Sequence, residues 1–448
     1  MTIAHQLGVF AASASATAKA RETARLLILD IAGLCLAARD FDYVRAARAS
    51  ATADGNATAL GHKGGFTPYD AALINGTAAH GEDYDDTFEG GPVHAGAVIV
   101  PAVLAIAEHR GLSGAAAMKG IAAGVEIMCR MSLVAPQATH KACFHPTAVF
   151  GAPAAAAGVG AALGLAPEKI AHAIAIAGSM ASGIIEYLSD GSWTKRMHPG
   201  QAAQSGIRAA LMAEAGFTGP STVIEGPHGF YKAVAPSKPP DFLQLLDGLG
   251  ARWYLETVAF KPYPCGTMTQ PFIDCAIELQ RQGLKAEDIV SMVCEVGEGT
   301  VHRLWEPLKQ KQTPPNGYAG KFSTPYCIAA GFIDGKVGFA QFTDERVKDP
   351  TLRALAAKVS FIVNPNDPYP KNFTGHIRST LKDGTVREIR KPHMRGGAHE
   401  PLTAADILAK FRDNARFGGF SAQNAETLAA ALDKISQGGA VDLKAARE

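Results

Sequence analysis

A helical spacing of apolar residues, repeated through the first part of the chain, is the feature that most constrains its fold. From Glu22 to Ala37 the apolar residues fall three and four positions apart, as on one face of an α-helix. The same spacing returns at 69–84, 97–109, 115–133, 147–163, 168–187 and 201–216. Because no strand-like alternation of comparable length interrupts these segments, we predict a helical domain of roughly 250 residues.

One uncharged run, Pro146 to Pro167, is long enough to cross a membrane. It is rich in Ala and Gly, poor in Leu and Ile, and interrupted by Pro153. Small residues transfer weakly to lipid but let helices approach closely. We therefore predict a buried helix in the core and no membrane partner.

Near Trp253 the pattern changes to that of a smaller α+β domain. Strands are expected at Ile289–Val296, at Val359–Val363 and in a hairpin, Gly375–Thr380 with Val386–Arg390, around the turn Asp383-Gly384. Helical patterns at Gln270–Gln282 and Pro325–Ile333 lie between them, the second opened by Thr324 as its N-cap.

Helical spacing returns after His393, with helix starts at Thr403 and Ser421. We therefore predict a mainly α protein, in which residues 1–256 and 394–448 form the helical domain and residues 257–393 form an inserted α+β lid domain. A cleft between two such domains is the expected place for a small ligand.

Charge and cysteine content exclude several classes of function. The formal net charge is +1, so the chain lacks the basic excess that nucleic-acid binding requires. Its seven cysteines contain no Cys-x-x-Cys pair, so we predict neither a disulfide framework nor a zinc or iron–sulfur site. Residues 1–20 lack a basic region followed by an apolar one, so we expect no signal peptide and a cytoplasmic protein.

The stretch His80–Gly96 combines acids, bases and the start of an apolar segment. A helix entering from Tyr69 would place His80, Asp83 and Thr87 on one face. The residues Gly90-Gly91-Pro92 would end it and turn the chain so that His94 faces back. The alternative is a solvated acidic helix end.

Two further segments carry basic groups at helix starts. His145 precedes the Ala-rich helix, where the helix dipole disfavours its protonated form; the alternative is an ordinary capping side chain. Lys195 and His198 lie just ahead of the predicted helix 201–216, where unpaired backbone N–H groups favour anions. Because a Walker-type glycine loop is absent, we expect a carboxylate there; the alternative is a solvated basic loop.

Lys261 lies in a proline-stiffened segment at the domain change, Phe260-Lys261-Pro262-Tyr263-Pro264, and is a candidate for holding an anion. Tyr326 follows Pro325 in the first turn of a helix, where the dipole favours a phenolate. The alternative for Tyr326 is core packing.

Taken together, these segments resemble the MmgE/PrpD family, which contains 2-methylcitrate dehydratases, cis-aconitate decarboxylases and an iminodisuccinate epimerase. The matching pieces occur in family order and are Asn75-Gly76, Asp83 to Thr87, His94, Phe144-His145-Pro146, Thr194-Lys195 to His198, Lys261-Pro262-Tyr263-Pro264 and Lys321-Phe322-Ser323 to Tyr326. The domain plan described above is also the plan of this family.

The resemblance implies an active-site cleft that contains Asp83, Thr87, His94, His145, Lys195, Lys261 and Tyr326. Two departures stand out. The loop Gly90-Gly91-Pro92-Val93 before His94 is longer than in many members and lacks their His-Pro, and Gly266 stands where several members have a histidine.

Our first hypothesis is a metal-independent lyase for a small di- or tricarboxylate, in the form of a 2-methylcitrate dehydratase-like hydro-lyase, with no cofactor and as a homodimer. In it, His94 and His145 exchange protons, Asp83 and Thr87 orient them, and Tyr326 serves as a second acid. The groups expected to bind the substrate are Lys195, Lys261, Thr87 and His198. An epimerase, a decarboxylase and a non-catalytic carboxylate-binding protein remain alternatives.

Overall fold

The computed structural model of the protein describes residues 1–91 and 93–447, and the chain divides into two compact units. The first unit contains Met1–Gly81, Asp85–Val258 and the residues from Ala404 onward, and the second contains Glu82–Tyr84 and Ala259–Thr403. The return to the first unit therefore comes at Ala404, where we had predicted 394. Pro92, which we expected to help end a helix, lies outside the described residues.

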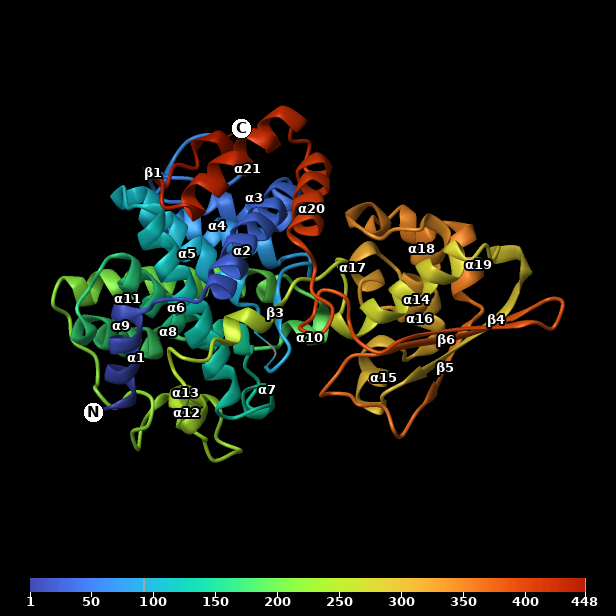
Figure 1. The fold of residues 1–448 in the computed structure, drawn as a ribbon, viewed down its shortest axis with the longest axis horizontal. Helices are drawn as coiled ribbons and strands as arrows, with labels where there is room; N and C mark the ends of the chain where they lie inside the picture. Colours follow the sequence, from blue (N-terminus) through green and yellow to red (C-terminus); the bar gives the residue numbers. More distant parts are fainter. Residues whose placement is uncertain (92, 448) are drawn as a thin grey trace. The chain divides into compact units, whose positions relative to one another are not determined.

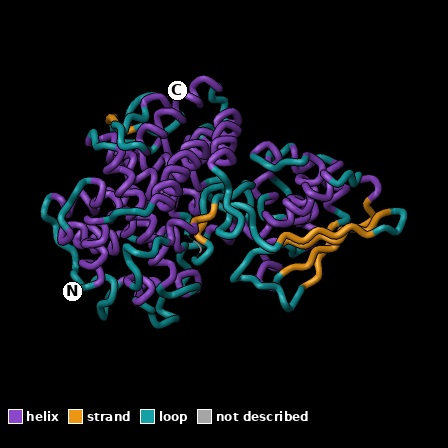
Figure 2. Tube along the Cα trace, in the orientation of Figure 1, coloured by secondary structure: helices purple, strands orange, loops and turns teal. Residues whose placement is uncertain are grey.

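The first unit is almost entirely helical (Figures 1 and 2), which confirms the predicted mainly α class. Its longer helices are α1 (Ile3–Ser13), α2 (Ala18–Ala38), α3 (Asp42–Ala49), α4 (Pro68–His80), α5 (Ala95–Arg110), α6 (Gly114–Leu133), α8 (Pro146–Ala162), α9 (Pro167–Met180), α11 (Thr194–Glu214), α20 (Ala404–Phe417) and α21 (Ala422–Ser436). Its shorter elements are β1 (Asp54–Ala57), β2 (Thr87–Phe88), α7 (Ala138–Lys141), α10 (Tyr187–Asp190), α12 (Phe230–Val234) and α13 (Leu243–Leu246).

Helix α8 lies at the centre of this unit, and all its residues are buried. It packs against α5, α6, α9 and α11. The α6–α8 crossing is so close that a Cβ on Gly120 would lie 2.5 Å from the carbonyl oxygen of Gly158. The prediction of a buried, small-residue helix is confirmed. In the described part of the chain, no helix is both long and apolar enough to span a membrane.

Helices α4 and α11 approach each other through a pair of glycines. A Cβ on Gly76 would lie 2.6 Å from the backbone of Gly200, and a Cβ on Gly200 would lie 2.2 Å from the carbonyl oxygen of Leu73. We had interpreted the residues before Gln201 as a loop, but α11 begins at Thr194. Gly200 serves helix packing here and not a turn, so Lys195 and His198 lie on the helix itself.

Arg130 on α6 fixes the chain around α13. Its side chain is fully buried and pairs with Glu126 one turn earlier, Nε to Oε1 2.6 Å. Its other nitrogens donate to backbone carbonyls between residues 244 and 252, including those of Asp247 at 2.9 Å and Arg252 at 2.8 Å. One buried guanidinium therefore satisfies a whole irregular segment, as buried backbone carbonyls require.

The C-terminal helices belong to the first unit. Ser421 caps α21, and α20 packs along α2. Lys410 on α20 pairs with Asp30 on α2, Nζ to Oδ1 2.8 Å, and both side chains are buried. Such a pair fixes the register of the two helices more than it adds stability.

The second unit contains one four-stranded sheet in the order β5-β4-β6-β7. Its strands are β4 (Ile289–Val296), β5 (Val359–Val363), β6 (Gly375–Leu381) and β7 (Val386–Lys391), with β5 parallel and β6 antiparallel to β4. The predicted strands and hairpin are confirmed, with Gly384 in the left-handed region at φ 83°.

Helices cover one face of this sheet (Figure 1). Helix α14 (Gln270–Arg281) packs on β6 and β7, and α18 (Thr324–Asp334) packs on α14. The cap of α18 is Ser323, whose hydroxyl accepts from the Tyr326 N–H, and not Thr324 as predicted. The remaining helices of this unit are α15 (Glu298–Leu304), α16 (Leu308–Gln312), α17 (Gly317–Gly320) and α19 (Pro350–Ala356).

Candidate functional site

The loop after α4 differs from the prediction. Helix α4 ends at His80, and Asp83 has a left-handed backbone at φ 57°, which is unusual for a residue other than glycine. The expected helical face of His80, Asp83 and Thr87 is therefore wrong, because the helix does not continue to Asp83. Left-handed non-glycine residues concentrate at functional sites, where the surrounding structure holds them.

The loop brings Asp85 back against the last residue of α4. The carboxylate Oδ2 of Asp85 lies 2.8 Å from His80 Nδ1, and both side chains are fully buried. A carboxylate in this position holds an imidazole in one tautomer and stabilises the charge that forms when the ring takes up a proton. The sequence alone predicts no role for this pair.

His94 is oriented by the same loop. As predicted, the chain turns back after Phe88, whose N–H donates to the Val93 carbonyl over 3.0 Å, and His94 immediately precedes α5. The His94 Nδ1 lies 2.7 Å from the Asp86 carbonyl oxygen and 3.4 Å from Asp85 Oδ2. Because a carbonyl only accepts, this contact places a proton on Nδ1.

Asp86 also fixes the start of α5. Its carboxylate Oδ2 accepts from the Gly96 N–H over 3.0 Å, and a Cβ on Gly96 would lie 2.4 Å from Asp86 Oδ1. A carboxylate is favourable at the positive end of a helix. Glycine at 96 therefore lets the loop close onto the helix and sets the position of His94.

Four histidine rings from separate elements meet in the first unit. His80 contacts His94 and His145, with ring centroids 4.7 Å and 5.7 Å apart. His145 lies at the start of α8, as predicted, but its side chain makes no capping hydrogen bond; its Nδ1 lies 3.1 Å from the Nδ1 of His198. We call His80, His94, His145 and His198 the histidine cluster.

Burial and neighbouring cations keep two members of the cluster neutral. Loss of hydration lowers the pKa of His145 well below its ordinary value, and His80 and Lys195 lower it further. The pKa of His198 falls to about 4, first through burial and then through the charge of Lys195. Both rings are therefore neutral at pH 7 and can accept or donate a hydrogen bond.

This neutrality predicts a pH dependence of stability. The folded-state pKa of His198 lies below its unfolded value, so the unfolded chain binds the proton more readily and stability falls as the pH drops from about 6.5 towards 4. The loss is about 1.4 kcal/mol per pH unit. In His198→Gln this part of the slope should vanish. Urea unfolding at pH 7 and pH 5 measures it, and an identical slope in both proteins would contradict the assignment.

Of the predicted site residues in the second unit, Asp83 and Lys261 pair with each other. Lys261 is buried, and its Nζ lies 3.1 Å from the Asp83 carbonyl oxygen and 3.3 Å from Asp83 Oδ1. Asp83 was expected to orient histidines and Lys261 to hold substrate. In the structure each has the other as its partner, so the charge of Lys261 is balanced by a carboxylate of the protein.

The structure contradicts the role predicted for Tyr326. Its side chain is fully buried in the core of the second unit, and its hydroxyl donates to the Gln341 carbonyl. Burial raises its pKa above the ordinary value of a tyrosine, so the phenolate predicted from the helix dipole does not form near neutral pH. The core-packing alternative is the one observed. Thr87, by contrast, is buried in β2 of the first unit.

His80, Asp85 and His94 also have the composition of a metal site, since one potential ligand atom from each lies within 4.8 Å of the others. The same atoms are engaged with one another and with the Asp86 carbonyl. While these Nδ1 atoms carry the protons of the two hydrogen bonds, they do not serve as metal ligands, so the contacts observed are those of a hydrogen-bonded set.

We therefore expect catalytic activity to survive exhaustive chelation. Turnover before and after dialysis against EDTA measures this. Loss of turnover that is restored by a divalent ion would mean that the three side chains rearrange to bind a metal.

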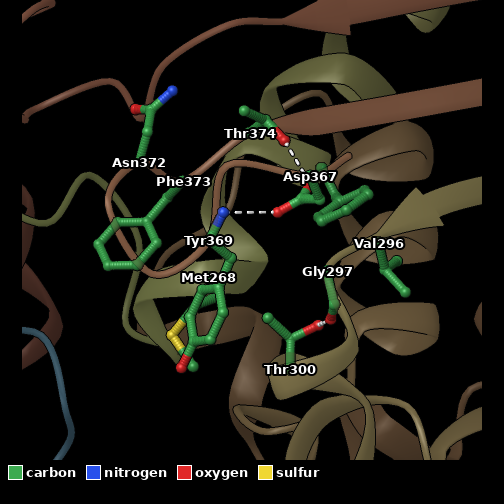
Figure 3. Close-up of a pocket in the computed structure, with 10 residues that line it drawn as sticks. Met268, Val296, Gly297, Thr300, Asp367, Tyr369, Asn372, Phe373 and Thr374 are labelled. Atoms are coloured by element: carbon green, nitrogen blue, oxygen red, sulfur yellow. Dashed lines mark hydrogen bonds between the residues drawn. The ribbon is translucent and has the colours of Figure 1, made fainter. Parts of the chain in front are cut away.

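A small pocket in the second unit is unrelated to these residues (Figure 3). Asp367 in its wall accepts from the Tyr369 N–H over 2.9 Å and from the Thr374 hydroxyl over 3.1 Å. Its volume of about 10 Å³ has room for about one water molecule. Among the described residues that line it, none was predicted as a site residue.

Two family models match the chain. The MmgE/PrpD N-terminal domain matches residues 5–243, and the MmgE/PrpD C-terminal domain matches residues 263–434. The chain belongs to the MmgE/PrpD family. The resemblance noted in the sequence is thereby confirmed, and the histidine cluster lies in the part that the N-terminal MmgE/PrpD domain covers.

The chain is similar to cis-aconitate decarboxylases and to 2-methylcitrate dehydratases. Cis-aconitate decarboxylase of Mus musculus is 30% identical over 358 residues, which cover 78% of this chain and 72% of the relative. Cis-aconitate decarboxylase of Aspergillus terreus is 27% identical over 420 residues, 87% of this chain and 84% of the relative. 2-Methylcitrate dehydratase of Cupriavidus necator is 25% identical over 289 residues, 61% and 58% respectively.

Proposed function

We propose that the protein is a lyase for a small tricarboxylate and that its reaction is decarboxylation of a cis-aconitate-like substrate. The observation that carries the choice of reaction is the extent of similarity. The two decarboxylases are matched over 72% and 84% of their length, and the C. necator dehydratase over 58%. Dehydration, the first hypothesis from the sequence, becomes the second candidate.

Decarboxylation of such a substrate needs one proton donor. The C–C bond to the departing carboxylate breaks, its electron pair forms a new C=C bond, and the former C=C bond takes up a proton at its other carbon. We assign that proton to His94. When protonated, the ring keeps its Nδ1–H on the Asp86 carbonyl and presents the transferable proton on Nε2, while the Asp85 carboxylate at 3.4 Å stabilises the charge.

His145 has the complementary role. Its pKa lies well below the ordinary value, so it stays neutral beside a protonated His94. A neutral imidazole can accept a hydrogen bond or a proton from the substrate. Helix α8 starts directly after His145, and the positive end of its dipole favours a carboxylate there.

Lys195 supplies the positive charge of this proposed site. It lies in the first turn of α11, and its charge acts on both His145 and His198. A lysine near a helix N-terminus and beside neutral imidazoles is suited to bind a substrate carboxylate. Lys261 belongs to the second unit, where its ammonium pairs with the carboxylate of Asp83.

Lys195→Met should lower kcat/KM by about 30-fold, which corresponds to about 2 kcal/mol for a charge-assisted carboxylate contact. The same change should raise the pKa of His198 above about 4, because one of its two causes is removed. Steady-state kinetics and an NMR titration measure the two effects. Lys169→Met, at an exposed lysine on α9, is the control. Unchanged values of both quantities in Lys195→Met would remove it from the site.

Dehydration of a 2-methylcitrate-like hydroxy acid uses the same residues differently. It needs a base for the α-proton and an acid for the departing hydroxyl, and neutral His145 with protonated His94 would provide them. The similarity to 2-methylcitrate dehydratase favours this second candidate.

Incubation of the enzyme with citrate, 2-methylcitrate, cis-aconitate and iminodisuccinate in deuterated water, followed by NMR, tests the proposal. Decarboxylation releases CO2 and leaves one deuteron in the product. Water loss from 2-methylcitrate would select the second candidate, and deuterium uptake without any bond loss would select an epimerase. Binding without turnover of any acid would overturn a catalytic function.

A further inference from the structure

The second unit holds three consecutive residues, Glu82, Asp83 and Tyr84, through a contact to each. Lys321 Nζ lies 2.8 Å from Glu82 Oε2 and 3.0 Å from the Glu82 carbonyl oxygen. Lys261 likewise contacts both the carboxylate and the carbonyl oxygen of Asp83. The Tyr84 hydroxyl donates to the Pro262 carbonyl over 3.1 Å. We call these three residues the anchored segment.

The Lys321 contact is buried and packed against aromatic rings. The lysine side chain is only 1% exposed, and its Nζ lies 5.2 Å from the ring centroids of both Phe339 and Phe342. The Glu82 side chain is 12% exposed. The free energy lost when two charges leave water offsets most of the attraction between them. A buried pair of this kind is therefore better explained by the register it fixes than by a gain in stability.

That register matters because of what flanks the anchored segment in the chain. His80 lies two residues before it and Asp85 directly after it, and these two side chains form the 2.8 Å pair of the histidine cluster. The segment includes the left-handed Asp83, a conformation that persists only when its surroundings hold it. Its backbone therefore determines how Asp85 meets His80.

We propose that Lys321 is a positioning residue for the histidine cluster: by holding Glu82 it keeps the anchored segment in the conformation that pairs Asp85 with His80. It does not touch the substrate. The inference rests on the proposed function, because the paired His80 and Asp85 in turn orient His94. Lys261 contacts the next residue of the same segment, because its ammonium pairs with Asp83.

Lys321→Met tests this, because methionine keeps the length and apolar contacts of the lysine stem and removes its charge. We expect kcat to fall about ten- to a hundredfold, as for other losses of alignment, with KM changed by less than about threefold. The low-field Nδ1 proton signal of the His80–Asp85 hydrogen bond, identified by its loss in Asp85→Asn, should disappear or broaden.

Lys358→Met is the matched control. Lys358 belongs to the same unit and donates to the Ala286 and Ile289 carbonyls, away from the anchored segment. Its variant should keep both kcat and the signal. If Lys321→Met does not fold, Glu82→Gln tests the positioning role instead. It removes the same ion pair but leaves the hydrogen bond to the Glu82 carbonyl. The double variant should lose no more than the stronger single variant.

A folded Lys321→Met enzyme that keeps the signal and kcat would overturn the inference. So would a rise in KM with the signal intact, because that would make Lys321 a substrate-binding residue. The NMR result needs no turnover, so if the wild-type protein converts none of the tested acids, the proposed function fails while the positioning role is still decided.

Discussion

Replacing His145 or His94 with glutamine lowers kcat/KM by about 10²-fold or more, because glutamine keeps a hydrogen-bonding side chain of similar size but cannot exchange a proton near neutral pH. Both histidines lie directly before a helix and not within an apolar stripe. Their contribution to the free energy of unfolding is therefore small beside their contribution to catalysis. Turnover and thermal midpoint of each variant measure the two effects.

His172→Gln is the control for this experiment. His172 lies on α9 in the same unit, and its Nδ1 is 3.3 Å from the Gly219 carbonyl oxygen, outside the histidine cluster. Its variant should turn over normally. If the midpoint of His94→Gln or His145→Gln fell sharply while the remaining folded enzyme kept normal turnover, these two histidines would be structural and the proton-transfer assignment would be wrong.

Arg130→Met should destabilise the protein by about 3–5 kcal/mol, the cost of breaking a fully buried ion pair from one side. Glu126 would remain in a site where burial already raises its pKa, and the carbonyls of Asp247 and Arg252 would lose their donor. The variant leaves the histidine cluster intact. Chemical unfolding at pH 7 measures the loss.

Two further variants test whether the loss comes from the buried ion pair. Glu126→Gln combined with Arg130→Met removes the unpaired buried charge and should recover part of the stability. Arg412→Gln breaks a pair with Glu426 in which both side chains are 50% exposed, and it should cost less than about 1 kcal/mol. A loss below about 1 kcal/mol in Arg130→Met as well would mean that the segment around α13 is held by other contacts.

The fold could be predicted wherever one local pattern decided the structure. The uncharged, small-residue run of α8 permits only a buried helix, and Asp383-Gly384 supplies the left-handed turn that β6 and β7 need. Prediction failed at the start of α11, expected at Gln201 and found at Thr194. The glycine before Gln201 could serve a turn or close helix packing, and only the neighbouring helix α4 shows that packing applies.

The candidate site could be predicted only in part. Motif spacing identified His94, His145, Lys195 and His198, which the structure places in one unit, around or next to a single cluster. The His80–Asp85 pair was missed because a helical pattern through residue 84 hid the end of α4. The signal available was the concentration of acids after His80, but nothing local indicates that Asp83 adopts a left-handed conformation.

The partners of Lys261 and Lys321 depend on contacts between residues far apart in sequence. A lysine between prolines indicates an anion nearby, yet the sequence does not say whether the anion belongs to the substrate or to the protein. Tyr326 shows the same limit, because the helix start was correctly located but the burial that raises its pKa comes from the surrounding core.

The central claim is that the histidine cluster transfers a proton to a tricarboxylate as a bond to carbon breaks. The direct measurement is the stoichiometry of CO2 release and deuterium incorporation with cis-aconitate in deuterated water, for the wild-type protein and for His94→Gln. We predict one deuteron in the product for each CO2 released, with both rates falling together by about 10²-fold or more in the variant. CO2 release without deuterium in the product, or at an unchanged rate in His94→Gln, would contradict the claim.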